Sequence, residues 1–194
     1  IITYLLLTIS YTFWLKKIAM LDVIFLGLLY MIRIAAGAIL ADVTLSFWFT
    51  GIALFLFISL AIAKRYSEIV SLGSHTDQHN VPGRGYELSD SSAAMALGVS
   101  TGIASVLIFT VYIQTNSVKL LYPSNNVLWF AIPVLMYWIG NLWLTAGRNE
   151  LNDDPVIFAI KNKKSLIAGI FLLVIFVLAS SEVPGDIIDS VLSR

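Results

Sequence analysis

A short charged run after a long apolar stretch offers the clearest chemistry in this chain. Lys64 and Arg65 begin the run, Tyr66 follows them and Glu68 ends it. Lys64 and Glu68 are four residues apart, so they share one face if a helix persists through the run. Lysine and arginine neutralise phosphate oxygens, and Mg²⁺ prefers one or two carboxylates together with substrate phosphates. The run therefore predicts a phosphate site formed by the first three residues, with Glu68 as a magnesium ligand.

Arg33 lies near the middle of the apolar run 21–41. A guanidinium at bilayer depth costs roughly 2.5–3.5 kcal/mol on insertion scales, so it should face partners or a water-filled cavity. Asp22 precedes it by about three helical turns, and Tyr30 and Gly37 flank it at i−3 and i+4. This stripe predicts a polar site inside a membrane, with Tyr30 and Arg33 at the phosphate. Alternatively, Arg33 only pairs with a carboxylate or with helix carbonyls to hold the bundle together.

Two further polar segments supply second-rank candidates. Arg84 lies in a turn between two glycines whose amides could cradle an anion, which makes it a candidate phosphate contact. Arg148, Asp153 and Asp154 precede a proline, and together they could orient a phosphate group or bind a divalent ion. One of these aspartates could instead cap a short helix that begins at Pro155.

The elements that must position these residues are membrane-spanning helices. Of 194 residues, 58% are hydrophobic and 12% charged, and the mean hydropathy of +0.87 exceeds what one soluble core could hide. Crossing a hydrocarbon core of about 30 Å takes about 20 apolar residues. We expect an all-α polytopic membrane helix bundle, with a partial first span over 1–15. The full spans are expected at 21–41, 45–63, 92–113, 127–146, where Pro133 lies inside the helix, and 166–180.

Basic residues are unevenly divided between the two sides of this expected bundle. Alternation of the spans puts only Lys119 and Arg194 on one side. The other side receives Lys16, Lys17, Lys64, Arg65, Arg84, Arg148, Lys161, Lys163 and Lys164. By the positive-inside rule, the connections 64–91 and 147–165 are cytoplasmic. We therefore expect a multi-pass protein of a bacterial or archaeal cytoplasmic membrane, with its site on the cytoplasmic side.

Several of these segments resemble the UbiA superfamily of membrane prenyltransferases, most closely its decaprenyl-phosphate phosphoribosyltransferase branch. The likeness runs from about Leu5 to Leu178. It is specific in the Lys-Arg-Tyr-x-Glu block at 64–68 and in the Asp-Asp-Pro-Val-x-Phe-Ala block at 153–159. It is more general elsewhere, over 11–17, Leu21-Asp22, 30–37, 137–143 and 147–150.

The resemblance implies nine transmembrane helices around a lipid-open cavity. In it, a polyprenyl phosphate or other isoprenoid lipid meets a phosphorylated donor, with Mg²⁺ as cofactor. In the phosphoribosyl branch, the polyprenyl phosphate attacks the anomeric carbon of phosphoribosyl pyrophosphate, whose diphosphate Mg²⁺ bridges. The family's first motif, Asn-Asp-x-x-Asp, does not occur in this sequence, and the second retains only Glu68 as an acid, as in the phosphoribosyl branch. We therefore expect 1–194 to be a single transmembrane domain, the C-terminal part of this fold, lacking N-terminal helices and inactive alone.

The expected function is transfer of phosphoribose from phosphoribosyl pyrophosphate to a polyprenyl phosphate. Membrane lipid and these two substrates are the expected partners, and we expect no nucleic acid. One alternative is a prenyltransferase that joins an isoprenyl diphosphate to an aromatic acceptor. Another is a non-catalytic transport or assembly subunit, although no second copy of the Arg33 or Lys64 pattern suggests the repeats typical of transporters.

Overall fold

Helices account for every regular element in the part of the chain that the structure describes. The computed structural model describes residues 2–73, 81–151 and 154–181. Its longer helices are α1 (Ile2–Phe13), α2 (Leu21–Leu40), α3 (Phe47–Gly73), α4 (Ser91–Tyr112), α6 (Ala131–Gly147) and α8 (Lys163–Ser180). Its shorter elements are α5 (Asn116–Leu121), α7 (Pro155–Lys161) and the 3₁₀ segments η1 (Leu15–Lys17), η2 (Leu88–Asp90) and η3 (Asn125–Phe130). The expected all-α bundle is confirmed.

Five helical segments among the described residues are long and apolar enough to cross a membrane, and they match the five expected spans. They cover Leu21–Leu40, Phe47–Gly73, Leu88–Tyr112, Asn125–Gly147 and Lys163–Ser180. Large apolar side chains on their outer faces are exposed, as on α8, where Leu173 is 64% exposed. Such a surface suits contact with hydrocarbon because lipid chains are as apolar as leucine. These features are those of a multi-pass integral membrane protein.

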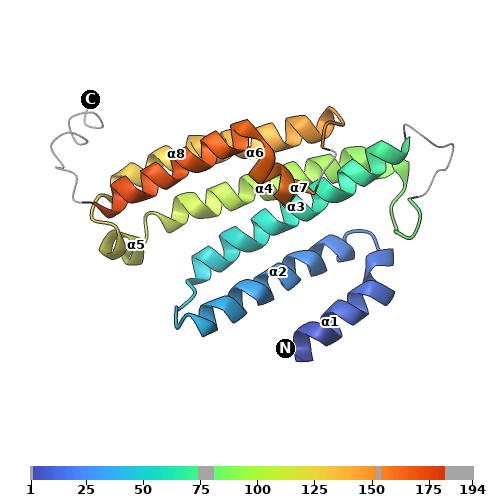
Figure 1. The fold of residues 1–194 in the computed structure, drawn as a ribbon, viewed down its shortest axis with the longest axis horizontal. Coiled ribbons are helices and arrows are strands. Elements are labelled where there is room, and N and C mark those ends of the chain that lie inside the picture. The colour runs from blue at the N-terminus through green and yellow to red at the C-terminus, as the bar shows by residue number, and fades with distance from the viewer. Residues whose placement is uncertain (1, 74–80, 152–153, 182–194) are drawn as a thin grey trace.

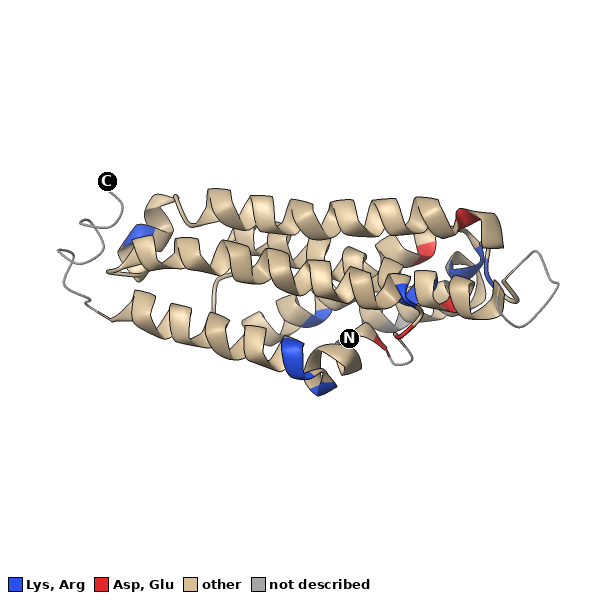
Figure 2. Cartoon of the chain, turned by 90° about the horizontal axis from the view of Figure 1, so that it is seen from above, with Lys and Arg blue, Asp and Glu red and all other residues tan. Residues whose placement is uncertain are grey.

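Neighbouring helices lie side by side in an order set by short connections. In Figure 1, α1 lies beside α2 and α2 beside α3, and the bundle continues through α4 and α6 to α8. The brief turn after α2 makes α2 and α3 antiparallel, as its length predicted. In Figure 2, the acidic residues in view lie toward one end of the bundle, whereas the basic residues are spread along its length. That end contains the polar continuation of α3.

Small residues let α3, α4 and α6 approach closely at the centre of the bundle. A Cβ atom at Gly98 would overlap the ring of Trp143, so this position accepts only glycine without movement. Ser59 Oγ donates a hydrogen bond to the Gly98 carbonyl at 2.7 Å and accepts one from Trp143 Nε1 at 3.2 Å. This buried contact links three helices. It fixes the rotation of α3, and therefore the direction in which its charged residues point.

The second span continues ten residues beyond its expected end. α3 includes the whole charged run and ends at Gly73, where the sequence predicted a span ending at Ala63. The extension is packed on its inner side, because Ile69 is only 1% exposed. The helix therefore persists through Glu68, and Lys64 and Glu68 lie one turn apart on it, as the phosphate-site hypothesis required.

Pro133 occupies the first turn of α6 and does not lie deep inside a continuous helix. The fourth span begins as the 3₁₀ segment η3 and changes to α-helix at Ala131. A proline in the first turn is tolerated because the amides of that turn have no intrahelical acceptor. Pro133 thus lies inside the span, as expected, and close to the junction between its 3₁₀ and α-helical parts.

Candidate functional site

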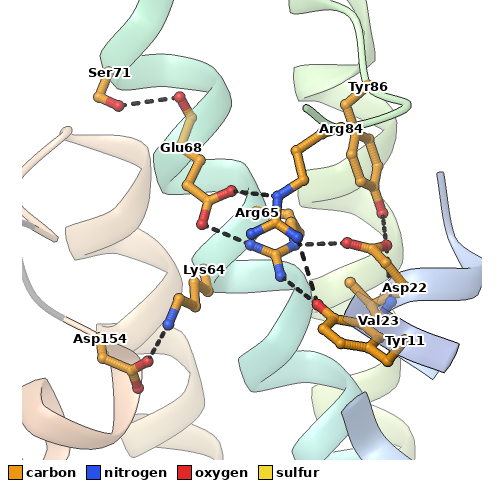
Figure 3. Close-up of polar contacts among 10 residues, drawn as sticks. All are labelled: Tyr11, Asp22, Val23, Lys64, Arg65, Glu68, Ser71, Arg84, Tyr86 and Asp154. Carbon is orange, nitrogen blue, oxygen red and sulfur yellow. Dashed lines mark hydrogen bonds and ion pairs between the residues drawn. The ribbon is translucent and has the colours of Figure 1, made fainter. Parts of the chain in front are cut away.

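An ion pair between Asp22 and Arg65 joins α2 to α3 at the polar end of the bundle (Figure 3). Arg65 Nε donates to Asp22 Oδ2 at 2.6 Å, and the two side chains are 3% and 0% exposed. The other carboxylate oxygen accepts a hydrogen bond from the Val23 amide at 2.8 Å. Removing one partner of such a pair would leave an uncompensated buried charge. The pair therefore locks the position of the Arg65 guanidinium.

Tyr86 fastens the loop 81–86 to the beginning of α2. Its hydroxyl donates to Asp22 Oδ1 at 2.7 Å and accepts from the Met20 amide at 2.9 Å. Burial raises the pKa of the Tyr86 phenol well above its ordinary value, and the Asp22 carboxylate adds to this effect. The phenol therefore stays protonated and keeps its role as a donor. Because a Cβ at Gly85 would overlap the Lys17 carbonyl, the loop backbone also packs directly on η1.

The loop presents Arg84 to the charged face of α3. Arg84 Nε lies 3.5 Å from Glu68 Oε2, and the other carboxylate oxygen, Oε1, accepts from Arg65 Nη1 at 2.6 Å. The Tyr11 hydroxyl, from α1, accepts from Arg65 at 3.0 Å and from Arg84 at 3.4 Å. Two guanidinium groups from distant segments thus meet around one carboxylate and one phenol.

A second ion pair ties α3 to the beginning of α7. Lys64 Nζ lies 2.6 Å from Asp154 Oδ2, and these side chains are 44% and 28% exposed. Ser67 Oγ donates to the Leu151 carbonyl at 2.6 Å, one helical turn further along α3. Asp154 immediately precedes Pro155 at the beginning of α7, and its carbonyl accepts from the Phe158 amide at 2.9 Å. The residue therefore serves both the helix start and the lysine contact.

A cavity of about 260 Å³ opens beside these charges, and we call it the cationic cavity. Tyr11, Arg65 and Arg84 line one part of it. Its remaining wall is largely apolar and aromatic, and includes Leu26, Tyr30, Phe57 and Leu60. The cavity therefore offers cations to an anionic group and hydrocarbon to an attached apolar chain.

A second cavity, of about 250 Å³, adjoins the first at the Lys64–Asp154 pair, because both residues line both cavities. We call it the serine-lined cavity, since Ser67 and Ser71 contribute to its wall together with Glu68, Asn149 and Leu151. Hydroxyl and amide groups suit hydrogen bonds to a ligand rich in hydroxyls, such as a sugar.

Of the residues singled out in the sequence, the structure brings Lys64, Arg65, Arg84, Glu68 and Asp154 together. It also gives the carboxylates cationic partners. Glu68 faces two guanidinium groups, and Asp154 lies against a lysine. Among the residues that the structure describes, no group of three potential metal-ligating side chains occurs. Asp153, the third acid assigned to Mg²⁺, lies outside the described residues.

Arg33 corrects the expectation that the whole phosphate site converges on one cavity. Its side chain is exposed, and its guanidinium lies over the rings of Tyr4 and Tyr30, 5.4 and 5.2 Å from their centroids. It also donates to the Tyr4 hydroxyl. Tyr30 does line the cationic cavity, where it stacks on Phe57 with ring centroids 4.8 Å apart. Arg33 lies eleven residues after Asp22 on α2, about 16 Å along the helix at 1.5 Å per residue, and is therefore separated from the pair that Asp22 forms with Arg65.

Tyr66 and Arg148 also lie outside the two cavities. Tyr66 is 8% exposed and packs edge-to-face on Trp143 in the bundle core. It is two residues from Lys64, about 200° around the helix, and therefore points away from the charged face. Arg148 is exposed at the C-terminal cap of α6, although its neighbour Asn149 lines the serine-lined cavity.

Tyr11 and Tyr86 are the site residues that sequence reasoning missed. Each is a single aromatic residue with no spacing relation to Arg65, which lies 54 residues from Tyr11 and 21 from Tyr86. The sequence did indicate that Asp22 needs a cationic partner, because a carboxylate at the start of an apolar helix requires one if it is buried. The sequence did not identify Arg65 as that cation.

Comparison with known proteins finds relatives that are longer than this chain. It is 34% identical over 178 residues to an uncharacterized protein, y4nM, of Sinorhizobium fredii, covering 91% of this chain and 34% of that protein. It is 30% identical over 182 residues to the nodulation protein NoeC of Azorhizobium caulinodans, covering 91% of this chain and 58% of NoeC. The chain therefore spans between about a third and three-fifths of these relatives.

A third similarity involves an enzyme. Over 66 residues, the chain is 36% identical to decaprenyl-phosphate phosphoribosyltransferase of Mycolicibacterium smegmatis. This matching segment covers 34% of this chain and 21% of that enzyme. No family model and no solved structure matches. The chain is thus similar over a third of its length to a decaprenyl-phosphate phosphoribosyltransferase, while the names of the two relatives above state no reaction.

Proposed function

We propose that this chain belongs to a membrane transferase of the UbiA type that moves phosphoribose from phosphoribosyl pyrophosphate to a polyprenyl phosphate. The observation that carries the proposal is the cationic cavity, which combines Arg65, Arg84 and Lys64 with an apolar wall in a membrane bundle. A lipid phosphate has this amphiphilic character. The partial similarity to a decaprenyl-phosphate phosphoribosyltransferase supports the same reaction.

The transfer breaks the bond between the anomeric carbon and pyrophosphate and forms a bond to an oxygen of the lipid phosphate. Negative charge develops on the departing pyrophosphate, and fixed cations stabilise such charge most effectively where water is excluded. Arg65 and Arg84 provide fork-shaped guanidinium groups that match phosphate oxygens. Leu26, Phe57 and Leu60 would contact the first part of the isoprenoid chain.

The serine-lined cavity is suited to the sugar of the donor. Ser67 and Ser71 donate their protons to backbone carbonyls at 2.6 and 3.0 Å. The Ser67 oxygen therefore offers a lone pair that can accept a hydrogen bond from a ribose hydroxyl. Lys64 lines both cavities and would contact a phosphate placed between sugar and lipid.

Mg²⁺ remains a prediction of the family resemblance, and the described residues do not offer it a suitable site. Each Glu68 oxygen faces a guanidinium, at 2.6 and 3.5 Å, and Asp154 contacts a lysine. Mg²⁺ requires near-octahedral oxygen ligands, often with one or two carboxylates and several waters. We therefore assign no step of the transfer to a metal held by these residues.

The test is turnover by the complete protein in nanodiscs, supplied with phosphoribosyl pyrophosphate, a polyprenyl phosphate and Mg²⁺. Arg84→Met should lower kcat/KM by about 10²–10³-fold, the usual loss of one charge-stabilising donor. Arg148→Met is the matched control, since Arg148 is exposed and lines neither cavity. Equal turnover by Arg84→Met and wild type would refute the proposed site. Turnover with an isoprenyl diphosphate and an aromatic acceptor instead would favour the prenyltransferase alternative.

The proposed reaction takes place on the cytoplasmic side. The supporting observation is the division of basic residues along the sequence, which places nine on this side of the expected spans and two on the other. The chain contains no cysteine, so Ser89→Cys provides a single thiol on the exposed segment after the loop. A membrane-impermeant maleimide should label it in inside-out vesicles and not in intact cells. The reverse labelling pattern would place the site outside.

A further inference from the structure

Asp22, Arg65, Glu68 and Arg84 form a ring of alternating charge, which we call the four-charge ring (Figure 3). Asp22 contacts Arg65, Arg65 contacts Glu68, and Glu68 contacts Arg84. Arg84 and Asp22, both in the described part of the chain, do not form an ion pair with each other. They are connected through Tyr86, which lies two residues after Arg84 in the loop and whose hydroxyl donates to Asp22. Two carboxylates thus balance two guanidinium groups within the ring, which leaves it with no net charge for an incoming anion.

The contacts of the four-charge ring differ greatly in strength. Arg65 is 3% exposed and makes two contacts of 2.6 Å, one to each carboxylate. Arg84 is 23% exposed, lies 3.5 Å from Glu68 and lies 3.4 Å from the Tyr11 hydroxyl. Partly exposed pairs at such distances contribute little, because solvent screens them. The Glu68–Arg84 contact is therefore the one that a ligand can break most easily.

Both guanidinium groups of the ring line the cationic cavity, whereas Glu68 lines the serine-lined cavity. An anion in the cationic cavity can therefore reach Arg84, whereas Glu68, which contacts the same guanidinium, is not among the residues that line this cavity. A phosphate has more charge than a carboxylate and can accept two parallel hydrogen bonds from a guanidinium. It can consequently replace the single long contact from Glu68.

We propose that Glu68 is the internal counterion of Arg84, and that a phosphorylated ligand displaces it on entering the cationic cavity. In this arrangement, Asp22 keeps Arg65 fixed while Arg84 exchanges Glu68 for a phosphate oxygen. The inference rests on the proposed function for the identity of the ligand class. It assigns Glu68 a role opposite to that of a magnesium ligand, because a counterion opposes anion binding and a metal ligand promotes it.

Calorimetric titration of the complete detergent-solubilised protein with inorganic pyrophosphate tests this role, with Mg²⁺ in one series and EDTA in the other. Glu68→Gln keeps the size of the side chain and removes its charge. It should bind pyrophosphate about two- to five-fold more tightly than wild type in EDTA, the factor set by loss of one partly exposed ion pair. Glu68→Asp keeps the charge and should stay within about two-fold of wild type.

A matched control separates this effect from the general charge of the surface. Glu87→Gln removes one negative charge from an exposed position near the same loop. The Glu87 carboxylate accepts a hydrogen bond from Ser89 Oγ at 3.2 Å and forms a capping box with Asp90, and within the described residues it makes no ion pair with Arg84. It should leave pyrophosphate affinity unchanged. Equal tightening by Glu87→Gln and Glu68→Gln would overturn the counterion role, since any lost carboxylate would then suffice. Unfolding midpoints of all variants verify that each is folded.

The remaining outcomes distinguish this inference from the proposed function. Weaker binding by Glu68→Gln, in Mg²⁺ alone or in both series, would identify Glu68 as a ligand-promoting group and overturn the counterion role only. Unchanged binding by Glu68→Gln would do the same. Absence of pyrophosphate binding in wild type and in every variant would overturn the proposed function, and the counterion role with it.

Discussion

Replacing Asp22 by asparagine tests the contact on which the polar end of the bundle depends. The substitution keeps the size of the side chain and the oxygen that accepts from Val23 and Tyr86. It removes the charge and places an amide donor against Arg65 Nε, where a carboxylate oxygen now lies at 2.6 Å. Both side chains are almost completely buried, at 0% and 3% exposure, so solvent cannot compensate.

The expected loss follows from the partner that stays behind. Breaking a buried ion pair by removing one member costs about 3–5 kcal/mol, because the other charge is left uncompensated. Arg65 retains Glu68, whose carboxylate is 32% exposed and lies 2.6 Å from Nη1. This second partner reduces the penalty, so we expect the free energy of unfolding to fall by about 3 kcal/mol, the lower end of that range.

The loss can be measured by SDS titration of the protein in dodecyl maltoside micelles, followed by far-UV circular dichroism. Asp42→Asn is the matched control, since Asp42 is exposed in the turn after α2 and has a φ of 53°, which asparagine also adopts readily. Its titration should coincide with that of wild type. A loss below about 1 kcal/mol for Asp22→Asn would be that of an ordinary substitution and would refute the buried pair.

Two further predictions concern packing and pH. Gly98→Ala should lower the unfolding midpoint, because the added Cβ would overlap the Trp143 ring. Gly140→Ala is the control: the space around Gly140 is open, so the midpoint of this variant should match or exceed that of wild type. Equal midpoints for the two variants would contradict the close approach of α4 to α6. For Tyr86, the unfolded phenol ionises around its ordinary pKa of 10.0 while the buried one, with its raised pKa, stays protonated. The unfolded state then binds fewer protons, so this contribution to stability is complete below about pH 9 and declines as the pH rises past 10. Tyr86→Phe should therefore lose less stability than wild type between about pH 9 and 11, and identical pH profiles would contradict the assignment.

Apolar length and spacing were sufficient to predict most of the helices. The sequence indicated five full spans, and each overlaps an observed one because crossing a hydrocarbon core requires a minimum apolar length. Lys64 and Glu68 were placed on one helical face by their spacing, and α3 does continue through both. Tyr66 shows the limit of reading a run of residues as one site. The same helical rotation that pairs its neighbours sends this residue into the core.

The partners of the charged residues were not predictable in the same way. Helical periodicity gives the direction of a side chain relative to its own helix, and it does not give the rotation of one helix against another. Arg33 was expected at the phosphate site on this basis, but α1 supplies the Tyr4 hydroxyl, and the guanidinium lies there. Asp22 and Tyr86 are 64 residues apart in the chain, and only the docking of the loop on α2 brings them together.

The sequence by itself therefore determined which segments are helices in a membrane and which of their faces carry charge, since both follow from local composition and period. Only the tertiary structure decided which charge meets which. Packing at Gly98 and Ser59 fixes how α3 is turned, and a carboxylate on α2 then becomes the partner of Arg65. Contacts between distant segments depend on this packing, because a buried ion has to find its counterion wherever the fold places one.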